Sequence, residues 1–263
     1  MTESNITFDD AGGYERMMGR WSRAAGTIFL EWLAPEPNAT WLEVGAGTGS
    51  FSQLVFDTCQ PGAIAAIDPA AAQVEHARSK PIASRVDFKV ADAMALPFAD
   101  RSFDVVVSAL VINFIPDPVR GVREMSRVAR PGGIVAGYVW DFAGTHSPAW
   151  PLLRSLQEIG ATPPQVPGTA ISNLDALQAI FGAAGLCNVE TKAIDVTMRY
   201  RDFDDYWSAA TPPFLPAVKA IAALPQDRQA KLREIVRGFV SADSHGEIAF
   251  AARAHAIKGQ VTA

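Results

Sequence analysis

Short apolar runs alternate with amphipathic stretches along residues 40–140. The runs lie at residues 41–44, 63–67, 86–90, 103–107 and 134–139. The second and fourth runs are almost continuously apolar, which is typical of strands covered on both faces. Because the stretches between the runs are long enough for crossover helices, the alternation predicts an α/β fold with a parallel sheet.

The segments on either side of this core have a different pattern. Residues 14–33 are amphipathic and predict an N-terminal helix. Beyond residue 141 prolines and aromatic residues become frequent, and the pattern predicts a helix, a strand, a helical region and a last strand, at residues 174–184, 188–198, 202–240 and 248–257. Since the helical region falls between two strands, we expect residues 199–245 to be an insertion and not a separate domain.

Composition and charge narrow the class of protein. A length of 263 residues allows one domain or two at about 150 residues each, and 49% hydrophobic residues are enough for a buried core. The formal net charge is −5, and Lys and Arg form no run, which argues against a nucleic-acid partner. No apolar run reaches the ~20 residues that span a bilayer, and no signal-peptide pattern opens the chain. We therefore expect a cytoplasmic protein without a membrane span.

Cysteine and histidine spacing gives no sign of a metal site. Cys59 and Cys187 form no CxxC pair, which is typical of two reduced thiols and not of a zinc ribbon or a redox dithiol. The four histidines are far apart and lack the HExxH spacing of a zinc enzyme: His76, His146, His245 and His255. The sequence therefore predicts no bound metal.

A glycine-rich segment joins the first predicted strand to a helix. It reads Glu43-Val44-Gly45-Ala46-Gly47-Thr48-Gly49. Glycines permit the sharp turn and let a ligand lie against bare backbone. A dinucleotide fingerprint would have Gly or Ala at the sixth position from Gly45, where this chain has Ser50. The loop therefore favours a cofactor without a diphosphate, with a tight turn that binds nothing as the alternative.

Polar residues close the next three apolar runs. Asp68 lies 23 residues after Gly45 and can accept both hydroxyls of a ribose; the alternative is a cap for a helix that begins at Pro69. Asp92 can accept from an adenine amino group, or it can bond its own backbone in a turn. Ser108 ends the fourth run, where open α/β sheets bind their ligands.

Four segments together resemble the class I S-adenosylmethionine-dependent methyltransferases, in particular the ubiquinone/menaquinone C-methyltransferase-like, or type 11, group. They are residues 42–49, residues 67–69, residues 91–98 with 102–104, and residues 130–133. The resemblance implies a Rossmann-like, seven-stranded, mostly parallel sheet with helices on both faces and an antiparallel last strand. It also implies S-adenosyl-L-methionine as cofactor and S-adenosyl-L-homocysteine as product. A single domain over residues 1–263 would comprise a helical lid (1–35), a cofactor-binding core (36–140) and a substrate side (141–263).

The resemblance also implies roles by position. The methionyl part of the cofactor would lie along Gly45, Ala46, Gly47 and Thr48, its ribose at Asp68 and Pro69, and its adenine between Asp92 and Ala93, with Ser108 under the methionyl chain. Tyr14 and Arg20 fall in a segment that is similar to the N-terminal lid of relatives. There the tyrosine would pack beside the cofactor and the arginine would meet its carboxylate. A solvated helix residue is the alternative for Arg20.

No catalytic residue is assigned by the sequence. Many relatives place a histidine after the fourth strand, where this chain has Ile112-Asn113-Phe114. Asn113, Asp141 and His146 lie in or just after strand ends that should face the site. His146 is the best candidate for a general base by its chemistry. The alternatives are a loop histidine without a role and, for Asp141, a turn cap.

The most favoured function is methyl transfer from S-adenosylmethionine to a small-molecule acceptor, by in-line displacement at the sulfonium methyl (EC 2.1.1.-). The alternatives are a module that binds the cofactor without turnover and a nicotinamide oxidoreductase. The first helix and residues 199–245 are candidate lids. They bring aromatic residues that favour an apolar or aromatic acceptor or, as the alternative, serve only packing: Trp21, Phe203, Tyr206, Trp207 and Phe214. The oligomeric state is left open.

Overall fold

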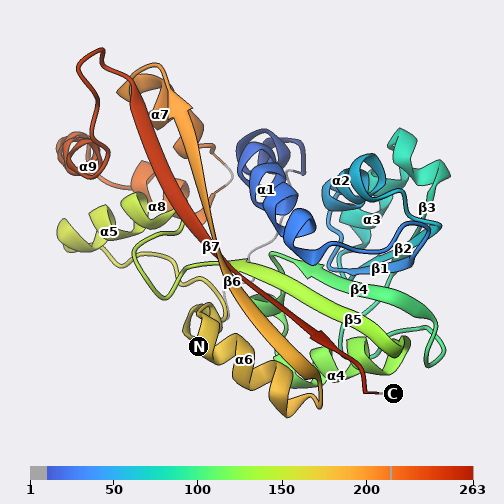
Figure 1. Ribbon diagram of the computed structural model, residues 1–263. Helices are drawn as coiled ribbons and strands as arrows, with labels where there is room; N and C mark the ends of the chain where they lie inside the picture. The colour runs from blue at the N-terminus through green and yellow to red at the C-terminus, as the bar shows by residue number, and fades with distance from the viewer. Residues whose placement is uncertain (1–10, 214, 263) are drawn as a thin grey trace.

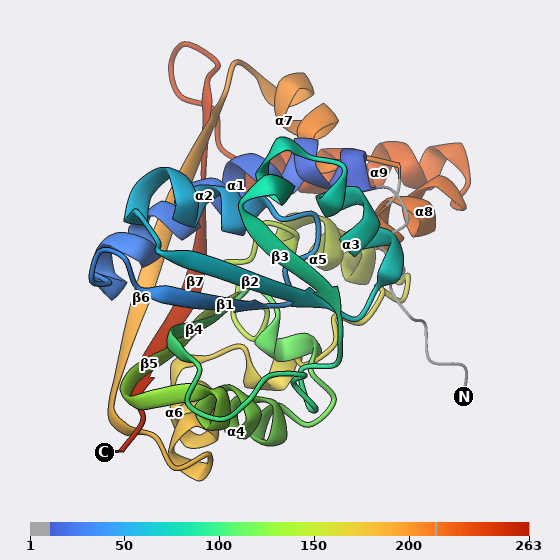
Figure 2. The ribbon, with the colours of Figure 1, turned by 90° about the vertical axis from the view of Figure 1, so that its right-hand side faces the viewer.

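The computed structural model describes residues 11–213 and 215–262, with side chains from residue 19 onward. Its strands form one seven-stranded sheet in the order β3-β2-β1-β4-β5-β7-β6 (Figures 1 and 2). The strands are β1 (Thr40–Val44), β2 (Ala63–Asp68), β3 (Val86–Val90), β4 (Phe103–Ala109), β5 (Ala129–Trp140), β6 (Cys187–Tyr200) and β7 (Ile248–Gln260). Strand β7 is antiparallel to both of its neighbours, and the other pairs are parallel. The predicted sheet, with its antiparallel last strand, is confirmed.

Helices cover both faces of the sheet, as the near-continuous apolar strands predicted (Figure 1). One face carries α1 (Ala11–Leu33), α2 (Ser50–Cys59) and α3 (Ala71–Arg78), and the other carries α4 (Pro118–Val128) and α6 (Leu174–Ala183). Side chains alternate between two core clusters along β4, where Val105 and Val107 join the first face and Val106 the second. The sheet is therefore buried between two apolar layers.

A third group of helices gathers beside the long β6–β7 hairpin (Figure 1). It comprises α5 (Trp150–Glu158), α7 (Phe203–Ala210), α8 (Pro216–Ala222) and α9 (Gln226–Phe239). Helices α7 to α9 follow β6 and precede β7, so the predicted helical region between the last two strands is present. Whether this region acts as a lid stays a prediction.

Helix α3 begins two residues later than the sequence suggested. The predicted start was Pro69, but the helix spans Ala71–Arg78 with Ala70 at its N-cap. The Oδ1 atom of Asp68 accepts the Ala70 N–H at 2.9 Å. Asp68 therefore organises the chain just ahead of the helix and does not cap its first turn.

Residues 130–133 differ from their predicted role in one respect. They do follow the end of α4 at Val128, whose start is capped by Asp117 as predicted, its Oδ1 accepting the Arg120 N–H at 3.0 Å. However, they lie inside β5, where the pairing with β4 jumps from Phe103↔Ala129 to Val105↔Ile134. The stop signal is therefore also an irregularity within the strand, and β5 begins earlier than the predicted residue 134.

The second half of the predicted lid helix is part of the core. Trp21 and Phe29 of α1 are 5% and 0% exposed. The ring of Phe29 lies 4.8 Å from that of Tyr138 on β5, and the ring of Trp21 lies 6.1 Å from that of Trp140. From Trp21 onward α1 is thus packed on the sheet, and any lid movement would be confined to the residues before it.

Candidate functional site

The glycine loop follows β1 and is tied to β2. The N–H groups of Gly45 and Ala46 both donate to the Ile67 carbonyl at 2.8 Å. Gly45 and Gly47 have φ values of 84° and 52°, which residues other than glycine rarely adopt. A Cβ on Gly45 would overlap the Val111 side chain, whereas one on Gly47 would meet no atom within 4 Å. The loop is therefore packed at Gly45 and open at Gly47, where a ligand can approach the backbone.

Asp68, at the end of β2, is the polar partner of this open position. Its Oδ2 accepts the Gly47 N–H at 2.8 Å, while its Oδ1 accepts the Ala70 N–H. Burial raises the pKa of Asp68, and the two backbone hydrogen bonds act in the opposite direction. Each carboxylate oxygen has two lone pairs, so a diol can still bind to the same group. Asp68 thus joins the glycine loop to the segment before α3; Pro69 lies exposed between them.

Strand register brings the other predicted cofactor residues to the same edge. The Ala91 N–H donates to the Asp68 carbonyl at 3.2 Å, which places Asp92 and Ala93 just beyond β3 beside the end of β2. Asp92 is exposed, and its Oδ1 accepts the Met94 N–H at 2.8 Å, so the alternative of a turn-forming aspartate is observed. This contact leaves the carboxylate accessible to a ligand.

Ser108 and Thr48 complete the edge. Glu43 pairs with Val107, so Ser108 lies beside the start of the glycine loop. Its side chain is fully buried, and its Oγ has no hydrogen-bond partner among the described residues. Thr48 is 8% exposed, with its hydroxyl 3.1 Å from that of Ser50. A buried hydroxyl without a partner is unfavourable, and a ligand at this edge would supply one to Ser108.

Glu43 is a feature of the site that sequence reasoning noted only as the acid before the glycines. It is 3% exposed, and the Ser52 hydroxyl on α2 donates to its Oε2. Burial raises the pKa of Glu43 to about 8, and the negative charge of Asp68 adds to the effect. A largely protonated carboxyl therefore lies under the glycine loop at neutral pH. Because a buried charge cannot be recognised from spacing alone, only the apolar residues around Glu43 could have indicated it.

The two lid residues are not brought to the glycine loop by any described contact. Tyr14 lies in α1, but its side chain falls outside the described residues, so its role stays a prediction. Arg20 is exposed. Its positive charge acts on the hydroxyl of Tyr200 on β6, whose pKa is nevertheless raised by burial. This position agrees with the alternative interpretation of Arg20 as a solvated helix residue.

The three candidate catalytic residues make structural contacts. Asn113 is 2% exposed, and its Nδ2 donates to the Pro167 carbonyl at 3.0 Å. Asp141 caps a turn, as its alternative interpretation expected, by accepting the Gly144 N–H at 2.7 Å. Its other oxygen lies 3.5 Å from Nδ1 of His146, which is half exposed.

His146 lies on the side of the sheet away from the aromatic residues of α1 and α7. Its carbonyl accepts the Arg253 N–H at 2.8 Å, and its ring acts on Asp195, which forms an ion pair with Arg253 at 2.7 Å. Asp195 is exposed, whereas both of its neighbours on β6, Ile194 and Val196, are buried in the first core cluster. Since side chains alternate along a strand, this geometry favours a structural role for His146 over that of a general base.

An aromatic cluster lies at the carboxyl end of β5, between α1, α7 and the β6–β7 hairpin. It consists of Trp21, Trp140, Tyr200, Phe203, Tyr206 and Phe250, linked by ring-to-ring distances of 5.2–6.1 Å. Trp207 contacts it through Phe203 at 6.0 Å, and Phe214 lies outside the described residues. The structure shows that these side chains pack together, which leaves their role toward an acceptor as a prediction.

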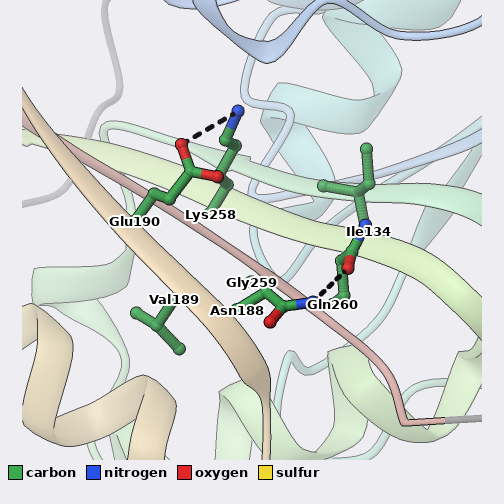
Figure 3. Close-up of a pocket in the computed structure, with 7 residues that line it drawn as sticks. All are labelled: Ile134, Asn188, Val189, Glu190, Lys258, Gly259 and Gln260. Carbon is green, nitrogen blue, oxygen red and sulfur yellow. Dashed lines mark hydrogen bonds and ion pairs between the residues drawn. The ribbon is translucent and has the colours of Figure 1, made fainter.

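A hollow of about 450 Å³ at the other end of the sheet does not belong to this site (Figure 3). It is lined by the start of β5, where Ile134 lies, and by the ends of the β6–β7 hairpin. Its polar groups are paired with one another: Lys258 with Glu190 at 3.5 Å, and Asn188 with Gln260 at 2.7 Å. The glycine loop lies at the opposite edge.

Neither a membrane-spanning helix nor a metal site is found in the part of the chain that the structure describes. No helix there is long and apolar enough to cross a membrane. Within the same residues, no group of three or more His, Cys, Asp or Glu side chains is arranged to hold a metal ion.

Comparisons with known proteins place this geometry in a family. Residues 42–137 match the family described as a methyltransferase domain. The ubiquinone/menaquinone biosynthesis C-methyltransferase of Roseobacter denitrificans is 30% identical over 138 residues, which cover 51% of this chain and 54% of that protein. The chain thus spans about half the length of the curated relatives it matches.

Solved structures agree over most of the chain. The YcgJ protein of Bacillus subtilis covers 91% of this chain and 98% of its own, with a TM-score of 0.61 and 20% identity. Phosphoethanolamine N-methyltransferase 2 of Haemonchus contortus, solved with phosphomonomethylethanolamine and S-adenosylhomocysteine, covers 98% and 58%, with a TM-score of 0.61 and 15% identity. Residues 42–137 therefore belong to the class I methyltransferase family, and the described chain has the fold of that family.

Proposed function

We propose that this protein transfers a methyl group from S-adenosylmethionine to a small-molecule acceptor. The observation that carries the proposal is the open position at Gly47, whose N–H is bonded to the Asp68 carboxylate at the carboxyl edge of the sheet. This is the edge at which open α/β sheets bind ligands. A small acceptor and a cytoplasmic location remain predictions from the composition.

The residues at this edge fit the parts of the cofactor. Gly45 to Thr48 offer backbone to the methionyl part, Asp68 offers carboxylate oxygens to the ribose hydroxyls, and the segment at Asp92 and Ala93 offers acceptor and donor groups to the adenine. The unpartnered hydroxyl of Ser108 lies beneath them. Ser50, at the position where a diphosphate would need Gly or Ala, disfavours the alternative of a nicotinamide cofactor.

The chemistry demands little more of the protein than binding, alignment and the exclusion of water. When bound, the cofactor supplies a sulfonium methyl group that is already electrophilic. The chain must therefore hold the acceptor in line with that methyl group, with the reacting atoms about 3–3.5 Å apart. Apolar surroundings favour this step, since charge is lost as it proceeds. The buried side chains of α1 and of the β6–β7 hairpin supply such surroundings at the carboxyl end of β5.

Asp68→Ala is expected to weaken cofactor binding by about 1–3 kcal/mol, because it leaves the ribose and Gly47 without their partner. Asp92→Ala is expected to act in the same direction and less strongly, since that carboxylate is exposed. Isothermal titration calorimetry with S-adenosylmethionine, S-adenosylhomocysteine and NAD measures both effects. Asp87→Ala is the matched control, because Asp87 is an exposed carboxylate near the start of β3. Wild-type affinity in both site variants, or tighter binding of NAD, would contradict the proposal.

His146→Ala is expected to keep turnover within about twofold of the wild type, since the ring lies with the Arg253–Asp195 pair and not in the aromatic cluster. Turnover is measured as release of S-adenosylhomocysteine in the presence of a metabolite extract. Asp68→Ala provides the inactive reference. A tenfold or larger loss in His146→Ala, with normal binding of S-adenosylhomocysteine, would restore His146 as a general base. Absence of turnover in the wild type, despite cofactor binding, would favour a non-catalytic binding module.

A further inference from the structure

Two buried polar atoms of the aromatic cluster have no hydrogen-bond partner among the described residues. They are the indole Nε1 of Trp140 and the hydroxyl of Tyr206, on side chains that belong to residues 3% and 1% exposed. The other two polar rings of the cluster satisfy each other, since the Trp21 indole bonds the Tyr200 hydroxyl. Because a buried donor without a partner is unfavourable, the two unpaired groups indicate that something else pairs with them.

The position of these groups relates them to the proposed site. Trp140 is the last residue of β5, two residues beyond Tyr138, which pairs with Ala109 at the end of β4. Ala109 and Leu110 pack against the same core cluster as Trp140. The Leu110 N–H donates to the Tyr138 carbonyl at 2.8 Å, which holds the two strand ends together. The unpaired groups therefore lie on the α1 side of the edge at which the cofactor is proposed to bind.

Trp41 offers a useful contrast. Its indole N–H is also buried and unpartnered among the described residues. However, Trp41 is the second residue of β1 and thus lies near the amino end of that strand, away from the glycine loop that follows Val44. An unpaired N–H at that edge is not accompanied by the carboxyl-edge setting that Trp140 and Tyr206 share. It serves as a control and not as a candidate.

We propose that Trp140 and Tyr206 determine acceptor specificity, by donating hydrogen bonds to an oxygen atom carried by a planar, apolar acceptor. The rings around them supply flat apolar surfaces for such a molecule, and the two donors select its oxygen. This inference rests on the proposed methyl transfer, because it names the class of acceptor for that same site. Trp140 and Tyr206 are positioning residues for the acceptor; neither exchanges a proton or an electron pair with it.

Access to the two donors requires α7 to separate from α1. Tyr206 lies on α7, an eight-residue helix, and contacts Phe250, which in turn contacts Trp21. The helix begins after the turn at Arg201 and Asp202 and is followed by Pro212 and Pro213. A short helix between two such connections can shift as a unit without disturbing the sheet. The acceptor would then lie between α7 and the Trp21–Trp140 pair.

The test compares two probes of similar shape, 2-naphthol and 2-methylnaphthalene, of which only the first carries an oxygen. Binding to the full chain is measured by ligand-observed NMR, with and without S-adenosylhomocysteine. Trp140→Phe and Tyr206→Phe each remove one donor and keep a ring. We expect each variant to bind 2-naphthol about fivefold or more weakly than the wild type and 2-methylnaphthalene within about twofold. Trp41→Phe, the matched control, should bind both probes as the wild type does.

Wild-type affinity for 2-naphthol in both variants, or no binding of 2-naphthol to the wild type, would overturn the proposal. Equal losses for both probes would also overturn it, because they would reflect ring packing and not the oxygen. Thermal unfolding of each variant verifies that it is folded, and removal of an unpaired polar atom should not lower its midpoint much. Calorimetry with S-adenosylhomocysteine separates the two proposals. Normal binding of this product with unchanged 2-naphthol affinity rejects only the acceptor proposal, whereas no binding to the wild type rejects the proposed function.

Discussion

Trp21→Ala is expected to lower the free energy of unfolding by about 3–5 kcal/mol, the range for removing a large aromatic side chain from a core. Trp21 is 5% exposed, and its ring lies 6.1 Å from that of Trp140 and 5.9 Å from that of Phe250. The substitution also leaves the Tyr200 hydroxyl without the indole N–H that now donates to it. Urea unfolding followed by circular dichroism measures the change.

The control for this prediction is Glu31→Ala on the same helix. Glu31 is exposed, so its removal should change the free energy of unfolding by no more than about 0.5 kcal/mol. A similarly small effect of Trp21→Ala would mean that α1 is a detachable lid from end to end, as the sequence suggested. The structure instead predicts that only the residues before Trp21 can be removed without loss of stability.

Glu43→Gln is expected to flatten the dependence of stability on pH. The pKa of Glu43 rises from 4.5 in the unfolded chain to about 8 in the folded one, chiefly because the carboxyl is buried. Below pH 4.5 both states carry the proton, and the contribution to stability is fully present. As the pH rises, the unfolded chain loses its proton first, so this contribution is lost up to about pH 8. Between about pH 5 and pH 8 the loss amounts to about 3–4 kcal/mol.

Urea unfolding of wild type and variant at about pH 5, 6, 7 and 8 provides the measurement. The amide that Glu43→Gln introduces has no proton to lose in this range, so the difference in unfolding free energy should grow in favour of the variant as the pH rises. Asp68, whose pKa is also raised, contributes a slope of the same sign in both proteins. Asp87→Asn, at an exposed position, is the control. Parallel pH profiles for wild type and Glu43→Gln would show that Glu43 is ionised in the folded protein.

Residues whose function follows from local pattern were well predicted from the sequence. The capped helix at Asp117, the glycine loop and the polar ends of β2 and β3 all depend on neighbours within a few positions. The family prediction rests on the same segments and is confirmed by the match over residues 42–137. The cofactor roles of Asp68, Asp92 and Ser108 remain predictions, although strand register does bring these residues to one edge.

Residues whose role depends on distant packing were predicted less well. A histidine near a strand end could face either side of the sheet, and only the pairing with Arg253 shows which side His146 takes. The amphipathic pattern of residues 14–33 is the same for a lid and for a core helix, so it could not indicate that Trp21 contacts Trp140. The unpaired atoms of Trp140 and Tyr206 have no counterpart in sequence, because they result from helices and strands that are far apart in the chain.

The place of β7 in the sheet has a consequence for biosynthesis. It is the last strand along the described chain, yet it lies between β5 and β6 and supplies hydrogen bonds to both. While the polypeptide is being translated, β6 and the free side of β5 therefore remain as open edges until residues 248–260 have left the ribosome. Exposed strand edges attract other chains, so we expect nascent protein stalled before this point to associate with chaperones or to aggregate.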